Sequence, residues 1–109
     1  MMKNDHTHNH SENQSVKKLA LYHYQSCLFC GITREAIKHL DGQEINQRDI
    51  QKEPVYRKEL ISGGGKPQVP CLKIETENGT IHWLYESRDI IRFLQRNDAV
   101  LKEAEKATA

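Results

Sequence analysis

Apolar positions in the first part of the chain predict a strand followed by a helix. Residues 18–24 carry apolar or aromatic side chains on both faces of an extended segment, which is typical of a strand in the middle of a sheet. Ser26 can cap a helix, and the apolar side chains after it recur at helical spacing, at Phe29, Ile32, Ala36, Ile37 and Leu40. We expect Asp41-Gly42 to end this helix.

The middle of the chain predicts a second strand and a second helix. Residues 44–50 have a weaker and more polar strand pattern, and Pro54 suits the first position of a helix that ends near Ser62. Three glycines at residues 63–65 follow. They are expected to separate this helix from the next strand.

The last third predicts an antiparallel hairpin and a final helix. Strand patterns at 69–74 and 80–85 flank Asn78-Gly79, a common two-residue hairpin turn because both residues tolerate positive φ. Ser87 can cap a helix whose inward-facing residues are Ile90, Ile91 and Leu94. The order is βαβαββα, with a helical crossover between two parallel strands and a hairpin in the same sheet. We therefore predict an α/β fold with a four-stranded mixed sheet flanked by helices.

The two ends differ in composition from this central domain at residues 16–97. Residues 1–15 are polar and are expected to be a disordered tail, since they have little to bury. His6, His8 and His10 alternate there and could catch a divalent ion, but a solvated tail is favoured. Residues 98–109 are rich in Ala, Lys and Glu, which predicts a helical extension or a frayed end.

Length and charge restrict the classes of function. The 109 residues correspond to one domain, and 16 basic against 15 acidic residues leave a net charge of +1. This balance gives no general electrostatic reason to bind nucleic acid or an anionic membrane. No apolar run is long enough for a membrane span, and the polar start lacks the pattern of a signal peptide. We expect a cytoplasmic monomer acting on a small or protein-bound substrate.

The three cysteines carry the chemistry that the sequence predicts. They are too few for a secreted disulfide framework and indicate a thiol or metal function. Cys27-Leu28-Phe29-Cys30 falls where the first strand meets the first helix. Because a helix N-terminus favours a thiolate, Cys27 is the expected nucleophile. Cys30, one turn later, can resolve a mixed disulfide formed on Cys27.

Two other interpretations of the C-x-x-C pair are less favoured. A structural zinc site needs a second pair of ligands at suitable spacing, and Cys71 stands alone while the histidines are scattered. A purely structural pair of buried cysteines does not account for the position at a strand-to-helix turn. We therefore expect no metal ligands, and we expect Cys71 to be a small residue packed near the sheet.

Val69-Pro70 is the second feature with predicted chemistry. A proline at the start of a central strand removes a hydrogen-bond donor where one is normally needed. A cis bond before Pro70 would explain its position beside the Cys27 turn. The N–H and C=O of Val69 would then be free to pair with an extended peptide ligand.

These motifs, in this order, resemble those of a known family. Residues 19–94 resemble the glutaredoxins of the thioredoxin-fold superfamily, and residues 64–72 and 84–91 look especially like glutaredoxins that resemble the N-terminal domain of glutathione transferases. The resemblance implies a thioredoxin-like fold. It also implies a glutathione-dependent thiol–disulfide oxidoreductase, with glutathione as the electron donor and no tightly bound cofactor.

The resemblance also implies a set of glutathione contacts. Val69 would pair with the cysteinyl backbone of glutathione, whose sulfur meets Cys27, while Glu86 and Ser87 would receive its γ-glutamyl end. Ser87 at a helix cap suits the carboxylate, and Glu86 can accept a hydrogen bond from the ammonium group. The other residues implied in the glutathione site are Tyr24, Phe29, Lys66, Gln68 and Pro70.

The chain departs from the family pattern at two points. Many glutaredoxins have Pro and Tyr between the cysteines, where this chain has Leu28-Phe29, and a Lys at the position of Tyr24. Without that Lys, Cys27 should depend more on the helix terminus, with Lys66 and Arg57 as candidate replacements. Without the Pro the first helical turn is less rigid, as in family members that hold a [2Fe-2S] cluster with glutathione as co-ligand.

The function predicted from the sequence is the reduction of glutathione mixed disulfides or protein disulfides through Cys27 and Cys30. Its expected partners are glutathione and glutathionylated or disulfide-containing proteins. The main alternative is a carrier or sensor of a glutathione-ligated [2Fe-2S] cluster. Another alternative is a binding domain of the glutathione transferase type.

Overall fold

The computed structural model describes residues 15–40 and 43–108. The histidine-bearing tail and the helix end expected at Asp41-Gly42 lie outside these residues. No helix in the described ranges is long and apolar enough to cross a membrane.

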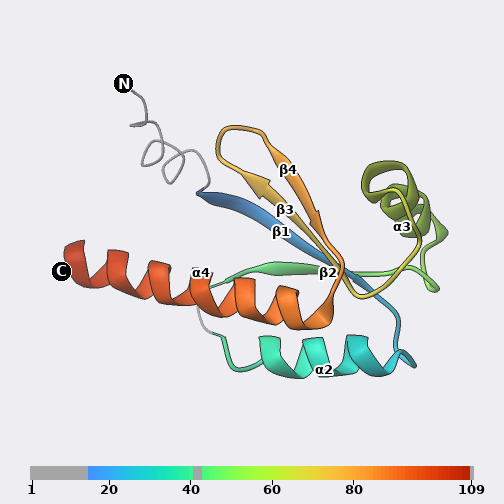
Figure 1. The fold of residues 1–109 in the computed structure, drawn as a ribbon, viewed down its shortest axis with the longest axis horizontal. Helices are drawn as coiled ribbons and strands as arrows, with labels where there is room; N and C mark the ends of the chain where they lie inside the picture. Colours follow the sequence, from blue (N-terminus) through green and yellow to red (C-terminus); the bar gives the residue numbers. More distant parts are fainter. Residues whose placement is uncertain (1–14, 41–42, 109) are drawn as a thin grey trace.

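The helices and strands follow the predicted order βαβαββα (Figure 1). One helix is longer than expected, because the second helix continues into a π-helical turn that includes Gly63 and Gly64. The elements are β1 (Val16–His23), α2 (Leu28–Ile37), β2 (Ile45–Asp49), α3 (Pro54–Glu59), the π-helical turn η1 (Leu60–Gly64), β3 (Cys71–Thr76), β4 (Ile81–Leu84) and α4 (Ser87–Thr108).

The four strands form one mixed sheet in the order β2-β1-β3-β4, with β1 and β3 in the centre. β1 runs parallel to β2 and antiparallel to β3, and β4 is antiparallel to β3. The α/β fold predicted from the sequence is confirmed, and the topology is thioredoxin-like. In the register, Tyr22 near the end of β1 lies opposite Cys71 at the start of β3. The end of β1 and the start of β3 therefore meet at one end of the sheet.

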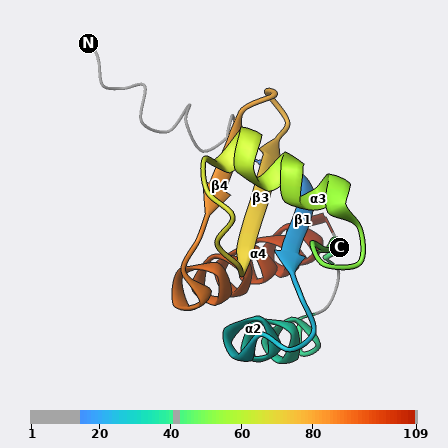
Figure 2. The ribbon, with the colours of Figure 1, turned by 90° about the vertical axis from the view of Figure 1, so that its right-hand side faces the viewer.

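The helices cover both faces of the sheet, with α3 on one side and α2 and α4 on the other (Figure 2). Because side chains alternate along a strand, β1 contributes to two separate cores. Leu19 and Leu21 pack with residues of β3 and α4, whereas Ala20 and Tyr22 pack with Leu60 of η1 on the opposite face. The sheet is therefore stabilised from both sides.

Two glycines of η1 make room for aromatic side chains of β4 and the residue after it. A Cβ atom on Gly63 would overlap the Trp83 ring, and one on Gly64 would overlap the Tyr85 hydroxyl. Gly65 ends the turn at a φ of 100°, a value that favours glycine. The residues that follow, which include Val69, are thus held close to the sheet.

Candidate active site at the end of the central strands

Cys27 occupies the N-cap of α2. Its amide donates to the Tyr24 carbonyl at 3.3 Å, which closes the turn after β1, and its Sγ accepts a hydrogen bond from the Cys30 amide at 3.3 Å. Ser26, predicted as the cap, lies one residue too early, because the Cys27 sulfur itself accepts the bond that a capping hydroxyl would accept. The placement of Cys27 at the start of the helix is confirmed.

The two cysteines of the motif differ in their access to solvent. Cys27 is half-buried, whereas Cys30 is completely buried. Burial, and next the hydrogen bond with Cys27, raise the pKa of Cys30, while the hydrogen bond with the Tyr24 backbone, and less so the Arg34 charge, oppose this rise. Cys30 therefore stays a thiol near neutral pH, and Cys27 is the sulfur that a substrate can approach.

Arg34 is a residue at this site that the sequence reasoning missed. Its guanidinium reaches back from α2 and donates to the carbonyls of Tyr24 and Gln25, each at 3.2 Å, and contacts His23 Nδ1 at 2.9 Å. A charged residue on an amphipathic helix carries no sequence signal for such a role, since most of them face solvent. The contacts become visible only when the helix is placed against the end of β1.

The Val69-Pro70 peptide bond is cis, which confirms the prediction. β3 begins at Cys71, two residues later than expected, so Val69 lies just beyond the paired part of the strand. Within residues 15–40 and 43–108, neither the amide nor the carbonyl of Val69 forms a hydrogen bond with another backbone group. The Val69 amide is therefore available to donate a hydrogen bond to a ligand, and the Val69 carbonyl is available to accept one. They lie at the end of the sheet where β1 leads to Cys27.

The start of α4 lies at the same end of the sheet, because Leu84 at the end of β4 pairs with Leu72 near the start of β3. The Ile90 amide donates to the Glu86 carbonyl at 2.8 Å, so Glu86 is at the capping position and Ser87 is the first helical residue. The prediction that Ser87 caps this helix is therefore wrong by one residue. The glutamate side chain is exposed.

The remaining candidate residues surround this end of the sheet in different environments. Lys66 is exposed, and its Nζ lies 4.7 Å from the centre of the Tyr85 ring. Gln68 is exposed, Pro70 is buried, and Tyr24 is half-buried against the core on the α3 face. Phe29, in the first turn of α2, is 57% exposed. Lys66 is thus held by an aromatic partner, while Phe29 and Gln68 are open to solvent.

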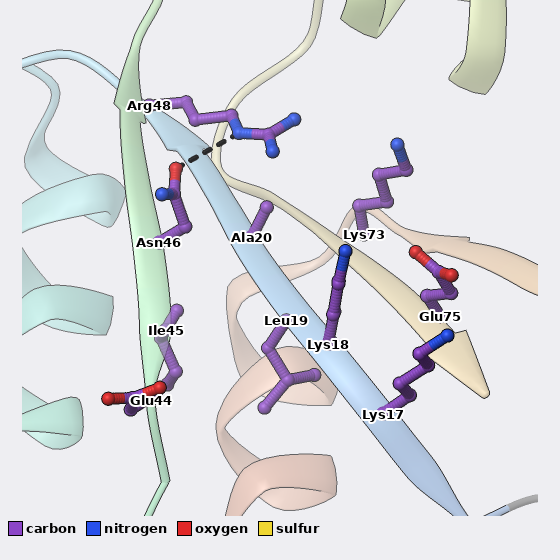
Figure 3. A pocket seen from close by; sticks show the side chains of 10 residues that line it. All are labelled: Lys17, Lys18, Leu19, Ala20, Glu44, Ile45, Asn46, Arg48, Lys73 and Glu75. Atoms are coloured by element: carbon purple, nitrogen blue, oxygen red, sulfur yellow. Dashed lines mark hydrogen bonds between the residues drawn. The ribbon is translucent and has the colours of Figure 1, made fainter. Parts of the chain in front are cut away.

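Two grooves help to locate the site. One of about 670 Å³ runs beside Cys27 along α2 and is lined by apolar residues that include Leu28 and Ile32. The other, of about 580 Å³, lies over strands β1, β2 and β3, where Lys18, Lys73 and other charged side chains project (Figure 3). None of the candidate residues lines this second groove. The first groove contains Cys27, but none of the residues predicted to contact glutathione lines it.

Cys71 does not take part in the site. It is completely buried beside Tyr22, and burial raises the pKa of its thiol to about 12. The prediction that Cys71 packs near the sheet is confirmed. Among the described residues, no three His, Cys, Asp or Glu side chains are grouped so that they could hold a metal ion.

Comparisons with known proteins were made by sequence and by structure. The family model described as Glutaredoxin matches residues 19–78. No curated protein matches the chain. A glutaredoxin from Brucella melitensis is 18% identical over 75% of this chain and 82% of its own, with a TM-score of 0.47. A maleylacetoacetate isomerase from Anaeromyxobacter dehalogenans 2CP-1, solved with glutathione (GSH) in its active site, is 27% identical with a TM-score of 0.48. The match covers 79% of this chain but only 39% of the isomerase.

Proposed function

The chain belongs to the glutaredoxin family, and on this premise we propose that it is a glutathione-dependent thiol–disulfide oxidoreductase. The observation that carries the proposal is the pairing of an accessible Cys27 at a helix N-cap with a buried Cys30 one turn later. At this cap position the Cys27 sulfur accepts a hydrogen bond from the Cys30 amide and remains accessible to a substrate.

The proposed reaction begins with attack by the Cys27 thiolate on a glutathione mixed disulfide. A bond forms between the Cys27 sulfur and the glutathione sulfur, and the disulfide bond of the substrate breaks, so the substrate leaves as a thiolate and takes a proton from water. The thiolate of a second glutathione then attacks the glutathionyl sulfur on Cys27. Oxidised glutathione leaves and Cys27 returns to its thiolate. In sum, one mixed disulfide and one glutathione give one substrate thiol and one oxidised glutathione.

In the proposed reduction of protein disulfides, Cys30 acts as the resolving thiol. After Cys27 forms a mixed disulfide with the substrate, the Cys30 sulfur attacks Cys27 and its proton passes to the departing substrate thiolate. Two glutathione molecules then reduce the Cys27-Cys30 disulfide and leave as oxidised glutathione. Burial keeps Cys30 protonated until that step, since burial raises its pKa.

We assign glutathione to the end of the sheet that Cys27 and Val69 share. The free backbone groups of Val69 suit the cysteinyl part of the tripeptide. At the start of α4, the unpaired first amides suit the γ-glutamyl carboxylate, and the exposed Glu86 suits its ammonium group. The Lys66 ammonium can pair with the glycyl carboxylate. The residues that complete the proposed site are Tyr24, Phe29, Gln68, Pro70 and Ser87.

The proposal also has consequences for compartment and partners. A reaction that consumes glutathione requires a compartment rich in that thiol, so we place the protein in the cytoplasm. Its partners are glutathione and proteins with glutathionylated or disulfide-bonded cysteines. The catalytic cycle uses one chain, and we propose that it acts as a monomer.

The test is a glutathione-dependent deglutathionylation assay on three cysteine variants. Cys27→Ser should abolish turnover, because it removes the accessible sulfur. Cys30→Ser should retain reduction of glutathione mixed disulfides and lose the route for protein disulfides. Cys71→Ala is the control and should keep activity, since the Cys71 thiol is completely buried and out of reach of a substrate. Equal loss in both C-x-x-C variants would contradict the proposal. A brown protein with glutathione-dependent colour would favour the iron–sulfur alternative.

The proposed position of glutathione predicts the effect of a change at Glu86. Glu86→Gln removes the negative charge that pairs with the ammonium group, so the KM for glutathione should rise roughly fivefold to tenfold, as expected for one exposed charged hydrogen bond. The control is Glu77→Gln, an exposed glutamate at the β3–β4 turn. An unchanged KM in the Glu86 variant would place the γ-glutamyl end elsewhere.

A further inference from the structure

Arg34 is the residue whose contacts no step of the proposed reaction explains. It lies two helical turns after Cys27, yet its side chain returns to the three residues at the end of β1 and the start of the turn. Nη1 donates to the Tyr24 carbonyl, Nη2 donates to the Gln25 carbonyl, and Nη1 also lies 2.9 Å from His23 Nδ1. A guanidinium can hold several acceptors in one plane, and a lysine ammonium cannot.

The Tyr24 carbonyl connects Arg34 to the nucleophile. It accepts from Arg34 and also from the Cys27 amide, the bond that closes the turn and sets Cys27 at the helix N-cap. The buried Cys30 thiol also interacts with the Tyr24 backbone. Arg34 alone adds bonds to the Gln25 carbonyl and to the His23 ring among the side-chain hydrogen bonds found in residues 15–40 and 43–108. The connection between β1 and α2 therefore depends on backbone turns, on the Cys30 thiol and on this guanidinium.

His23 is the third residue that the Arg34 guanidinium contacts. It is buried at the end of β1, and its carbonyl accepts from the Ile50 amide at 2.9 Å, which fixes the backbone at this residue. Because arginine only donates hydrogen bonds, His23 Nδ1 must be the acceptor, so the ring is neutral with its proton on Nε2. Arg34 thus joins α2 to a rigid part of the sheet.

We propose that Arg34 is the positioning residue for Cys27. Its guanidinium holds the turn between β1 and α2 so that the Cys27 sulfur stays at the helix N-cap and faces the end of the sheet where Val69 lies. The expected loss of turnover rests on the proposed oxidoreductase function. The expected loosening of the turn before Cys27 does not. Misplacing a nucleophile by about 1 Å can slow a reaction by up to about a hundredfold, so the expected effect is measurable.

The experiment compares three variants of the full chain. Arg34→Met keeps an unbranched apolar stem and removes the donors. Arg34→Lys keeps the charge and loses the planar fork. Lys38→Met is the matched control for the loss of charge, because Lys38 is the C-cap of α2 and forms an ion pair with the exposed Glu35. Each is measured for turnover of a glutathione mixed disulfide and for hydrogen exchange of the Cys27 amide and of the core amide of Leu21.

Both Arg34 variants should lose roughly tenfold in kcat while the KM for glutathione changes less than about twofold. Exchange of the Cys27 amide should accelerate by about tenfold, and that of Leu21 should not change, because the effect is confined to the turn. Lys38→Met should match the wild type. If Arg34→Met does not fold, Arg34→Lys carries the test, since it retains the stem and the charge.

Three results would overturn the proposal. The first is full activity in Arg34→Lys, which would show that charge alone matters. The second is faster exchange at Leu21 to the same extent as at Cys27, which would make Arg34 a general stabiliser. The third is unchanged exchange at Cys27. If the wild type shows no glutathione-dependent turnover, the proposed function fails, and amide exchange at Cys27 still decides the role of Arg34.

Discussion

At the scale of single residues, three cysteines of the same chemical type occupy three different environments. Cys27 is half-buried at the helix N-cap, Cys30 is buried one turn into the helix, and Cys71 is buried between the sheet and α3. Burial raises the pKa of both buried thiols, to about 12 for Cys71. Since only a thiolate reacts as a nucleophile, the environment selects one sulfur of the three.

This selection predicts the pattern of chemical labelling. Iodoacetamide at pH 8 should modify Cys27 in the native protein and leave Cys71 unmodified, because Cys71 is both buried and protonated. In denaturant all three cysteines should react at similar rates. Peptide mass spectrometry of the two samples measures this difference. Native labelling of Cys71 as fast as Cys27 would contradict it.

His23 predicts how stability depends on pH. Burial, and next the Arg34 charge, lower the pKa of His23 below its usual value, while Asp49 opposes the shift and Lys52 adds to it. The unfolded chain, with a pKa of about 6.5, then binds the proton more readily than the folded chain. The free energy of unfolding should therefore decrease as the pH falls below about 6.5, and this loss should level off below the lowered pKa of the folded state.

Urea unfolding between pH 7.5 and pH 5 measures this dependence. The variant His23→Gln keeps an acceptor near Arg34 and cannot titrate, so its unfolding free energy should fall less over this range than that of the wild type. His39→Gln is the control, because His39 is exposed in the turn after α2, beside Glu35. Identical pH profiles for the wild type and His23→Gln would refute the assignment of this loss to His23.

At the scale of elements, the segment from α3 to β3 depends on close packing of backbone against aromatic rings. Gly63 and Gly64 in η1 pass so near Trp83 and Tyr85 that a side chain on either would overlap the ring. The Tyr85 hydroxyl donates to the Lys66 carbonyl at 3.0 Å and so holds the residues that follow the turn. This packing determines where the chain re-enters the sheet before Val69.

Gly64→Ala should therefore destabilise the protein by about 1–3 kcal/mol, the usual effect of overpacking. Gly31→Ala is a matched control within α2. Its Cβ would meet only Arg34 Nη2 at 3.6 Å, an ordinary contact, so it should stabilise the helix by about 0.5–1 kcal/mol. Urea unfolding of both variants gives the free energies. Equal stability of the two would contradict the packing described for η1.

At the scale of the whole molecule, the two faces of the sheet are covered unequally. α2 and α4 cover one face along its length, whereas α3 and η1 cover only part of the other (Figure 2). A polar cluster helps to attach α3 there. The Tyr22 hydroxyl donates to Glu59 Oε1 at 2.8 Å, and Arg48 Nη1 donates to the same hydroxyl at 2.7 Å and to Glu59 at 2.8 Å. One cluster thus joins β1, β2 and α3.

Removing the Tyr22 hydroxyl tests this attachment. Burial, and next the hydrogen bond to Glu59, raise the pKa of Tyr22 to about 12, so the hydroxyl remains a donor at neutral pH. Tyr22→Phe should lower the free energy of unfolding by roughly 1 kcal/mol, the usual effect of losing one buried hydrogen bond. Tyr85→Phe, which removes an exposed bond, should have a smaller effect. Urea unfolding decides, and an equal effect in both variants would argue against a special role for the cluster.

The sequence alone determined the order of the elements, the position of Cys27 at the start of a helix and the unusual bond before Pro70. The first two follow from local rules: side-chain periodicity, turn residues and the spacing of two cysteines within one helical turn. The cis bond was predicted from Pro70 at the start of a central strand, taken together with the C-x-x-C motif expected beside it. The observed helix N-caps are Cys27 and Glu86, each one residue away from the predicted Ser26 and Ser87. The hydrogen bond that forms decides which residue is the cap, and residue type alone does not.

Only the tertiary structure decided which residues far apart in the sequence support the site. Arg34 holds the turn before Cys27, and Gly64 makes room for Tyr85, a residue 21 positions later. The sequence predicted that Cys71 differs from Cys27, but only the tertiary structure shows that Cys71 is buried in contact with Tyr22 and Leu60. The physical reason is the same in each case. The contacts that a side chain can reach, the atoms it would overlap and its burial from water all depend on which surfaces folding brings together. A pattern along one strand or helix does not contain that information.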